Sequence, residues 1–382
     1  MLKVLAVFGT RPEAIKMAPL VKELEKHRAE IDCKVAVTAQ HREMLDQVLS
    51  LFEISPTYDL DIMRHGQNLF DITGRALAGL EKVLIKEKPD LVLVHGDTTT
   101  TFVAALASFY LHIPVGHVEA GLRTRDKFSP FPEEINRHLT GVLADLNFAP
   151  TATARQNLLE EGVPAGKIFI TGNTVIDALL ATVKQEYQFN DRILDGIDYG
   201  SQRVLLVTTH RRENLGEPMR DIYRALREVV ECYPDVEVVF PVHKNPAVRN
   251  VVEEELDGLA RVHLIEPMDY QPFANLIERS YLVLSDSGGI QEEAPSRGKP
   301  VLVLRNTTER PEAVEAGTVR LVGTARLKVA GETRRLLDDR DFYKEMANAV
   351  NPYGDGHASA RIVKAIRFHF GLSAERPGEF CP

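Results

Sequence analysis

The chain has 382 residues, 44% of them hydrophobic, and its 46 Lys and Arg against 55 Asp and Glu leave a net charge of -9. Single hydrophobic cores rarely grow past about 250 to 300 residues, so two domains are expected. With a negative net charge and no long basic run, the chain lacks the electrostatic footprint of a nucleic-acid-binding protein, and no nucleic-acid partner is expected.

The N-terminal segment, residues 1–8, lacks the layout of a signal peptide and is typical of a first strand. No apolar stretch reaches the roughly 18 residues that span a bilayer, which predicts a cytoplasmic protein without a membrane partner. The three cysteines, Cys33, Cys232 and Cys381, are far apart and have no paired spacing. Neither a disulfide framework nor a cysteine-based metal site is therefore expected.

Apolar runs of strand length alternate with amphipathic helical patterns along the chain. The first series predicts strands at residues 4–8, 34–38, 91–95 and 115–118, with helices such as 15–25 and 72–86 between them. The second series predicts strands at residues 203–208, 236–242, 262–265, 282–285 and 301–304. This alternation predicts an α/β protein with two parallel sheets, each flanked by helices.

Residues 185–202, rich in charge and turn formers, separate the two series and are predicted to be a linker. Ligands of open α/β sheets bind beyond the carboxyl ends of the strands, so two facing domains would create one site in the cleft between them. The last residues, 371–382, have the composition of a loose tail.

A nucleotide-diphosphate site is indicated by the segment DSGGIQEE, residues 286–293, which follows a buried strand and enters a predicted helix. Gly288 and Gly289 would let a ligand approach the backbone, and the first turn of a helix favours an anion. Ser287 adds a hydroxyl donor, and Glu293 could accept hydrogen bonds from ribose hydroxyls. The alternative is an ordinary glycine turn of an α/β domain.

Two cations follow the first strand in FGTRPEAIK, residues 8–16, where Pro12 suits the first position of a helix. Arg11 and Lys16 lie near this helix start and could clamp a phosphate, or could be no more than a solvated helix terminus. The spacing is neither that of a P-loop nor that of a dinucleotide fingerprint.

Carboxylates stand at successive strand ends, with Asp97 after strand 91–95 and Glu119 after strand 115–118. Strand alternation places His117 and Glu119 on the same side. Glu133 stands at the start of a following helix. Converging carboxylates can have raised pKa values that suit acid–base catalysis, although Asp97 could be a helix cap and Glu133 a favourable charge at a helix dipole. The second series adds His210 and His243 at strand ends.

Six segments in chain order carry a family resemblance: FGTRPEAIKMAPL, HGDTTTT, HVEAGLRT, PEEINR, THRREN and DSGGIQEEAP. Together they strongly resemble the non-hydrolysing UDP-N-acetylglucosamine 2-epimerase family, over residues 4–370. The resemblance implies two Rossmann-like domains, similar to GT-B glycosyltransferases, with the active site in the cleft. The implied domains are residues 1–184 and 203–357, and residues 358–370 form a helix that crosses back to the first domain.

The resemblance implies interconversion of UDP-GlcNAc and UDP-ManNAc, by anti elimination of UDP to 2-acetamidoglucal and re-addition of UDP. No cofactor is implied. The expected partners are the two UDP-sugars, UDP and a second copy of the chain. The implied pathway is cell envelope polysaccharide biosynthesis. Asp97, Glu119, Glu133 and His210 match the family's catalytic residues. The implied nucleotide contacts are Arg11, Lys16, Met268 through its backbone, Phe273, Ser287, Gly288, Gly289, Glu293 and Arg310.

Some bacterial family members bind a second UDP-GlcNAc at an activating site. Residues that match this site are Gln40, His41, Arg211 and His243. Two positions depart from the pattern, because Glu43 stands where a glutamine is usual and Gly66 stands where an arginine is usual. Both departures count against substrate activation.

Three other functions compete with this interpretation. A retaining glycosyltransferase on the same architecture would use the same nucleotide pocket but would not need several carboxylates around the sugar. A hydrolysing epimerase would release free ManNAc and UDP, and the absence of an extra kinase domain favours the non-hydrolysing form. A silent UDP-sugar-binding regulator would have no reason to carry all the catalytic matches.

Overall fold

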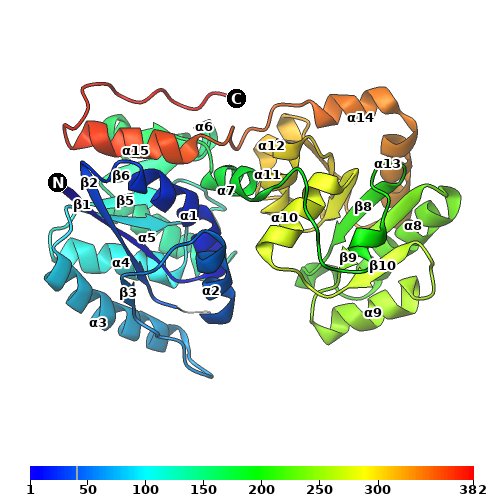
Figure 1. Ribbon diagram of the computed structural model, residues 1–382, viewed down its shortest axis with the longest axis horizontal. Coiled ribbons are helices and arrows are strands. Elements are labelled where there is room, and N and C mark those ends of the chain that lie inside the picture. Colours follow the sequence, from blue (N-terminus) through cyan, green and yellow to red (C-terminus); the bar gives the residue numbers. More distant parts are fainter. Residues whose placement is uncertain (40–41) are drawn as a thin grey trace. The chain divides into compact units, whose positions relative to one another are not determined.

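The computed structural model describes residues 1–39 and 42–382 of the chain, which fold into two compact units (Figure 1). Unit 1 comprises Met1–Ala181 and Tyr353–Pro382, and unit 2 comprises Thr182–Pro352. Each unit holds one wholly parallel sheet, so the predicted fold class is confirmed. Residues 185–202, the predicted linker, fall in unit 2, and residues 358–370 fall in unit 1.

The sheet of unit 1 has seven strands in the order β3-β2-β1-β4-β5-β6-β7. Its strands are β1 (Leu2–Phe8), β2 (Ile31–Val37), β3 (Tyr58–Asp59), β4 (Leu91–His95), β5 (Val115–Val118), β6 (Leu146–Ala149) and β7 (Ile168–Ile170). Strands β3, β6 and β7, which have two, four and three residues, were not predicted.

Helices cover both faces of this sheet. They are α1 (Arg11–Glu25), α2 (Arg42–Leu51), α3 (Leu69–Glu87), α4 (Thr99–Tyr110), α5 (Glu133–Leu143), α6 (Ala152–Glu160), α7 (Thr174–Thr182) and α15 (Ala358–His369), with the 3-10 turn η1 (Ala165–Lys167). Strand β1 shows the alternation that creates two cores, because Val4 and Ala6 pack with α1, α2 and α15, whereas Leu5 and Val7 pack with α3 and α4.

Helix α15 lies beside α1, although the two helices are more than 300 residues apart in the chain (Figure 1). Its buried residues Ile362, Val363 and Ile366 belong to the same core as α1. The Asp177 carboxylate of α7 fixes the start of α15 by accepting hydrogen bonds from Ala358 N at 3.2 Å and Ser359 N at 2.7 Å. Burial raises the pKa of Asp177 despite these bonds.

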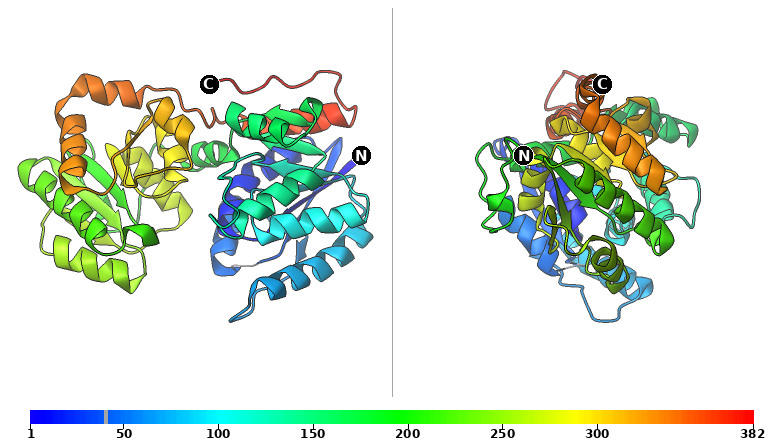
Figure 2. Two further views of the ribbon diagram at one scale, coloured as in Figure 1. Left: turned by 180° about the vertical axis from the view of Figure 1, so that it is seen from behind. Right: turned by 90° about the vertical axis from the view of Figure 1, so that its right-hand side faces the viewer.

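The predicted loose tail, residues 371–382, has no regular secondary structure and is mostly exposed, but it runs back along unit 1 (Figure 2) and is attached there by two residues. Phe380 is buried, and its N–H donates to the carbonyl of Ile170 on the edge strand β7 at 2.8 Å. The Arg376 guanidinium lies 4.9 Å from the centre of the Phe169 ring. An aromatic residue and a cation thus anchor a segment whose composition indicated no regular structure.

The sheet of unit 2 has six strands in the order β10-β9-β8-β11-β12-β13. They are β8 (Arg203–Thr208), β9 (Val236–Pro241), β10 (Val262–Ile265), β11 (Leu282–Ser285), β12 (Val301–Val303) and β13 (Val319–Leu321). The helices are α8 (Glu217–Cys232), α9 (Pro246–Leu256), α10 (Tyr270–Arg279), α11 (Ile290–Glu293), α12 (Pro311–Glu315), α13 (Arg326–Asp338) and α14 (Arg340–Ala347), with 3-10 turns η2 (Leu194–Gly196), η3 (Arg212–Asn214) and η4 (Ala294–Arg297).

Residues 185–202 are packed onto unit 2 rather than forming a free connection. The Arg279 guanidinium of α10 lies 5.1 Å from the Phe189 ring centre and 5.2 Å from that of Tyr199. It also donates a hydrogen bond to the carbonyl of Tyr187. The aromatic side chains of this segment therefore hold it on unit 2, although its high charge content indicated a free linker.

Across residues 1–39 and 42–382, we find no helix with the length and apolar character needed to cross a membrane.

Candidate active site

In unit 1, the loops that follow β1 and β4 are fixed to each other by the buried Glu13 carboxylate. One oxygen accepts hydrogen bonds from Gly9 N at 3.1 Å and Thr10 N at 2.8 Å, which caps the start of α1. The other oxygen accepts from the hydroxyls of Thr98 at 2.7 Å and Thr101 at 3.1 Å. Thr98 also caps α4. Neighbouring strand ends are thereby held in register at the edge where a ligand is expected.

Arg11 and Lys16 both lie on the first turns of α1. The Lys16 ammonium forms an ion pair with Glu119, whereas no ion pair or hydrogen bond joins the Arg11 guanidinium to another residue among those described. Arg11 thus remains available to an anionic ligand at a helix N-terminus.

Glu119 is only 7% exposed, and three elements converge on its carboxylate. Besides Lys16 of α1, the Asn173 side chain donates to Oε2 at 2.8 Å and His95 Nε2 of β4 lies 3.7 Å from the same atom. Strand β5 ends at Val118, and Glu119 itself has a φ of +61°. The alternation predicted for Glu119 therefore does not apply, because the residue has left the strand in a left-handed conformation.

His117 lies inside the sheet, where its Nε2 is 2.7 Å from the carbonyl oxygen of Gly96. Complete burial lowers the pKa of His117 to about 3, so the ring is neutral at physiological pH. The geometry indicates a structural histidine that ties β5 to the loop after β4.

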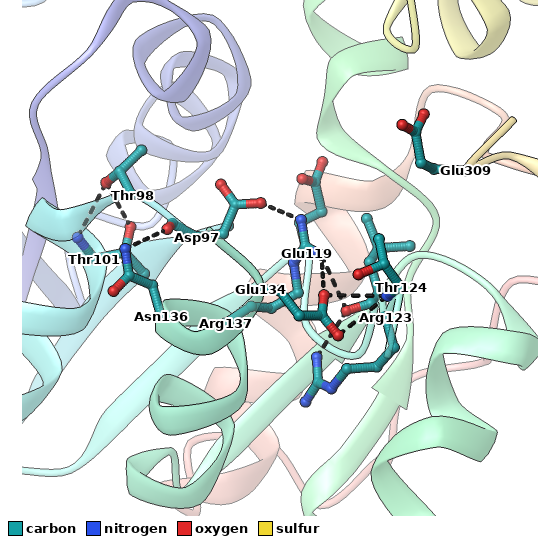
Figure 3. Close-up of polar contacts among 12 residues, drawn as sticks. Asp97, Thr98, Thr101, Glu119, Arg123, Thr124, Glu134, Asn136, Arg137 and Glu309 are labelled. Atoms are coloured by element: carbon teal, nitrogen blue, oxygen red, sulfur yellow. Dashed lines mark hydrogen bonds and ion pairs between the residues drawn. The ribbon is translucent and has the colours of Figure 1, made fainter. Parts of the chain in front are cut away.

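Asp97 is paired with the nearly buried guanidinium of Arg137 from α5, as Figure 3 shows. Arg137 also contacts a Glu134 oxygen at 3.4 Å and the carbonyl of Leu122 at 3.2 Å. Asn136 donates to the backbone carbonyl of Asp97 at 3.0 Å. Asp97 and Glu119 were predicted to converge as repelling carboxylates, but each is paired with a cation.

The two carboxylates at the start of α5 differ in their surroundings. Glu134 is buried and accepts hydrogen bonds from the backbone N–H groups of Thr124 at 3.1 Å and Arg125 at 2.9 Å (Figure 3). Glu133 is half-buried, and it has no ion pair or side-chain hydrogen bond with any residue in the described part of the chain. Glu134 therefore stabilises the loop that contains Thr124 and Arg125, whereas Glu133 is available to a ligand.

In unit 2, the imidazole of His210 is held at the end of β8 by the fully buried carboxylate of Asp286. Asp286 Oδ1 lies 3.1 Å from His210 Nδ1, and the carboxylate also accepts from the backbone N–H groups of His210 and Arg211. Asn214 donates to it at 3.2 Å. Burial by itself would raise the pKa of Asp286, but these interactions, led by that with His210, lower it overall.

His243, at the end of β9, stacks on His210 with ring centres 6.0 Å apart. Burial, followed by the neighbouring His210, lowers the pKa of His243. Arg211 donates through Nε to the carbonyl of Asp286 at 3.3 Å. The two predicted histidines and Arg211 therefore form one cluster with Asp286.

The predicted glycine turn lies at the end of β11. Ser287 N donates to Ser285 Oγ at 3.0 Å, and Gln291 Nε2 donates to the carbonyl of Ser287 at 3.2 Å. A Cβ added to Gly288 would meet only Arg211 Nη2, at 4.0 Å, so the space above this glycine is open. The helix that follows, α11, is only four residues long and continues as the 3-10 turn η4.

The remaining predicted nucleotide contacts of unit 2 lie on α11, on or just before α10, and at the start of α12. Burial and the neighbouring Glu293 carboxylate of α11 raise the pKa of Tyr270, which lies at the start of α10, well above its usual value. Phe273 lies half-buried on the same helix, α10, and Met268 is half-buried just before it. Arg310 forms an ion pair with the buried Glu292.

The predicted activating site is described only in part. Gln40 and His41 lie outside the described residues, and Glu43 belongs to α2. Gly66 has a φ of +72°, a conformation that an arginine would adopt only with strain. The backbone conformation at position 66 therefore favours the glycine found here over the arginine that is usual in the family. Substrate activation stays a prediction.

Sequence reasoning missed Asn173, Asp286 and Arg137 as partners of the predicted site residues. Arg137 and Asp286 lie inside two of the identified motifs, PEEINR and DSGGIQEEAP. Their presence in these motifs could have indicated that they contact the candidate site residues. Asn173 had no such signal, because it follows the short unpredicted strand β7.

A family model described as UDP-N-acetylglucosamine 2-epimerase matches residues 22–367. The chain belongs to the UDP-N-acetylglucosamine 2-epimerase family. The predicted family resemblance is confirmed, and with it the assignment as an enzyme of this family.

Relatives and solved structures agree with this family over nearly the whole length. The UDP-N-acetylglucosamine 2-epimerase of Bacillus subtilis is 56% identical over 379 residues, which cover 99% of this chain and 98% of the relative. The Neisseria meningitidis UDP-GlcNAc 2-epimerase bound to UDP-GlcNAc has 53% identity and a TM-score of 0.87, covering 96% of this chain and 99% of that one. An S. aureus MnaA–UDP co-structure has 51% identity and a TM-score of 0.90, covering 100% of both chains.

Proposed function

We propose that the protein interconverts UDP-GlcNAc and UDP-ManNAc reversibly at C2 without hydrolysing either nucleotide sugar. The observation that carries this proposal is the family match over residues 22–367, because it spans every candidate site residue from Asp97 to Arg310. Relatives whose structures contain UDP-GlcNAc or UDP support the class of ligand.

The proposed reaction is an anti elimination of UDP to 2-acetamidoglucal, followed by re-addition of UDP. In the first half, a carboxylate removes the C2 proton, the C1–O bond breaks, and its electron pair leaves with UDP. In the second half, UDP re-adds at C1 while a proton is delivered to the opposite face of C2. Asp97, Glu119 and Glu133 are the candidates for these proton transfers, each near the carboxyl end of the first sheet.

Departure of UDP requires cations and hydrogen-bond donors that meet the growing negative charge. Arg11 of unit 1 has no partner of its own among the described residues, and the open turn of unit 2 offers the backbone N–H groups of Gly288 and Gly289. His210, held by Asp286, would donate to the diphosphate. We propose that the nucleotide sugar engages groups of both units. Met268, Phe273, Glu293 and Arg310 would contribute the other nucleotide contacts.

We also propose a cytoplasmic homodimer that needs no cofactor or metal. Exposed apolar side chains on the neighbouring helices α4 and α5 of unit 1, among them Phe109, Tyr110 and Val142, support association with a second copy. For substrate activation, Arg211 and His243 are suitably clustered, whereas the backbone at Gly66 counts against it.

In deuterated water, the purified protein is expected to convert UDP-GlcNAc alone into UDP-ManNAc that carries deuterium at C2. Elimination breaks the C2–H bond, and the proton delivered afterwards comes from a group in exchange with solvent. Proton NMR of the reaction mixture measures both the appearance of UDP-ManNAc and the loss of the C2 signal.

Each competing function gives a different spectrum in this experiment. Free ManNAc with UDP would contradict the proposal and favour a hydrolysing enzyme. Unchanged UDP-GlcNAc would favour a transferase that lacks its acceptor or a binding regulator. UDP-ManNAc without deuterium at C2 would support epimerisation but overturn the elimination mechanism.

Substitution Gly288→Ala is expected to weaken UDP binding by about tenfold, equivalent to roughly 1.4 kcal/mol. The added methyl group meets only Arg211 Nη2 at 4.0 Å in the protein itself, so it would block the ligand without disturbing the fold. Isothermal titration calorimetry with UDP measures the affinity. Gly331→Ala in α13, where an added Cβ meets nothing within 4 Å, is the matched control and should bind UDP normally. Equal affinities for the two variants would exclude close approach of UDP to Gly288.

A further inference from the structure

Asn173 lies in the loop between β7 and α7 and is only 2% exposed. The two ends of its side chain serve different partners. Nδ2 donates to Glu119 Oε2 at 2.8 Å, and Oδ1 accepts from Val175 N in the first turn of α7 at 3.2 Å. An amide carries N–H donors at one end and an acceptor oxygen at the other, which is the combination that this position uses.

The backbone of Asn173 is fixed from another direction. Its N–H donates to the carbonyl oxygen of Tyr353 at 2.6 Å, where the chain re-enters unit 1. A Cβ added to Gly354, whose φ is +154°, would lie 3.4 Å from Asn173 O and 3.5 Å from Asn173 N. This close packing of two loops fixes the backbone of Asn173, and from there the amide nitrogen points toward Glu119.

Glu119 needs such a partner because of where it stands. It has left strand β5 with a φ of +61°, so the sheet does not fix its side chain. Lys16 supplies charge on a flexible stem, whereas the Asn173 amide is planar, buried and anchored at its other end. When a catalytic carboxylate must reach one atom of the substrate, the reaction slows if that carboxylate can adopt several orientations.

We propose that Asn173 is a positioning residue for the epimerase reaction, which holds the Glu119 carboxylate in its productive orientation through Nδ2. The inference rests on the proposed function and adds a residue that acts through Glu119 rather than on the substrate. It concerns the donor end of the amide, so variants that keep the acceptor end isolate the effect.

Substitution Asn173→Asp keeps an oxygen for Val175 N and replaces the donor by a carboxylate oxygen that faces Glu119. At pH 8 we expect kcat to fall by about 100-fold, while KM changes less than about threefold. Two carboxylates in one site raise the pKa of the pair, so a proton is taken up as the pH falls. The protonated pair again has a donor, and the kcat ratio of variant to wild type should rise between pH 8 and pH 6.

Substitution Asn173→Ser also keeps a capping oxygen for α7, but its short side chain brings no donor to Glu119. We expect a loss in kcat of about tenfold or more that does not recover at low pH, because no new titratable group is introduced. This neutral variant decides the question if Asn173→Asp does not fold.

Asn68→Asp is the matched control for the change of amide to carboxylate. Asn68 caps α3 by accepting from Asp71 N at 3.0 Å, and it too has a neighbouring carboxylate, but the pair is exposed and belongs to another helix. Its kcat should equal that of the wild type throughout the pH range.

Steady-state kinetics from pH 6 to 8, with melting temperatures for every variant, separates the outcomes. A wild-type protein that makes no UDP-ManNAc would refute the proposed function itself. A wild type that epimerises, with Asn173→Asp and Asn173→Ser at full kcat, would overturn the positioning role alone. Equal losses at every pH in both variants, with lowered melting temperatures, would also overturn it, because they would indicate a general structural role.

Discussion

Replacement of Glu119 by glutamine is expected to lower kcat by about two orders of magnitude or more, the typical scale for a lost acid or base. The substitution keeps the size of the side chain but removes the charge that pairs with Lys16 and the ability to exchange a proton. Binding of UDP should change much less than kcat. Turnover of UDP-GlcNAc, followed by proton NMR, and calorimetry with UDP measure the two effects.

The matched control for this change is Glu231→Gln, an exposed position on α8 in unit 2. It should leave kcat and the melting temperature unchanged. A Glu119→Gln protein that is folded and retains near full activity would remove Glu119 from the mechanism. The role of base would then fall to Asp97 or Glu133, whose amide variants test them in the same way.

Asp286→Ala is expected to lower both stability and turnover. The buried carboxylate accepts hydrogen bonds from His210 N, Arg211 N and Asn214 Nδ2, and it holds the His210 ring. Each buried donor left without a partner costs about 1–3 kcal/mol, so a loss of several kcal/mol is expected. Because His210 also loses its orientation, kcat should fall by about tenfold or more. Chemical denaturation and steady-state kinetics measure the two losses.

Asp286→Asn separates charge from hydrogen bonding at the same place. The amide oxygen still accepts from part of the donor set, so this variant should be more stable than Asp286→Ala. Its kcat should still be below that of the wild type, because the charge beside His210 is gone. Wild-type stability in Asp286→Ala would contradict the assigned role of this carboxylate.

Much of the fold could be predicted because long apolar runs and sheet geometry are local properties of the sequence. The runs that became β4, β5, β8, β10 and β11 are found at the predicted residues. Strands β3, β6, β7 and β13 were not predicted, and their length alone does not explain this, because β5, β10 and β11 have only four residues each and were found. Asn173 was missed because candidate site residues were selected at the ends of predicted strands, and β7 was not predicted.

Local backbone chemistry explains two further differences. The helix expected after the glycine turn stops as α-helix at Glu293, and Pro295 in the following turn has no N–H with which to continue the helical pattern. The signal was present in the sequence at Pro295. The left-handed φ of Glu119, by contrast, has no signature in the neighbouring residues, so alternation was extended one residue too far.

Candidate site residues could be predicted individually, but their partners could not. Asp97 and Glu119 were selected because each follows a buried strand. Their cations, Arg137 and Lys16, come from positions 40 and 103 residues away, and such pairings depend on how helices lie on the sheet. Two of the three expected carboxylates, Asp97 and Glu119, are therefore held in separate ion pairs.

The division of the chain has a consequence for the order in which the protein can be completed during synthesis. Unit 1 is assembled from both ends of the chain, whereas unit 2 is one uninterrupted segment. Until residues 353–382 have left the ribosome, α1 lacks the helix whose Ile362, Val363 and Ile366 share its core, and an apolar strip stays uncovered. Unit 2 can thus finish folding first, while the half of the enzyme that begins at the N-terminus has to wait for the last helix.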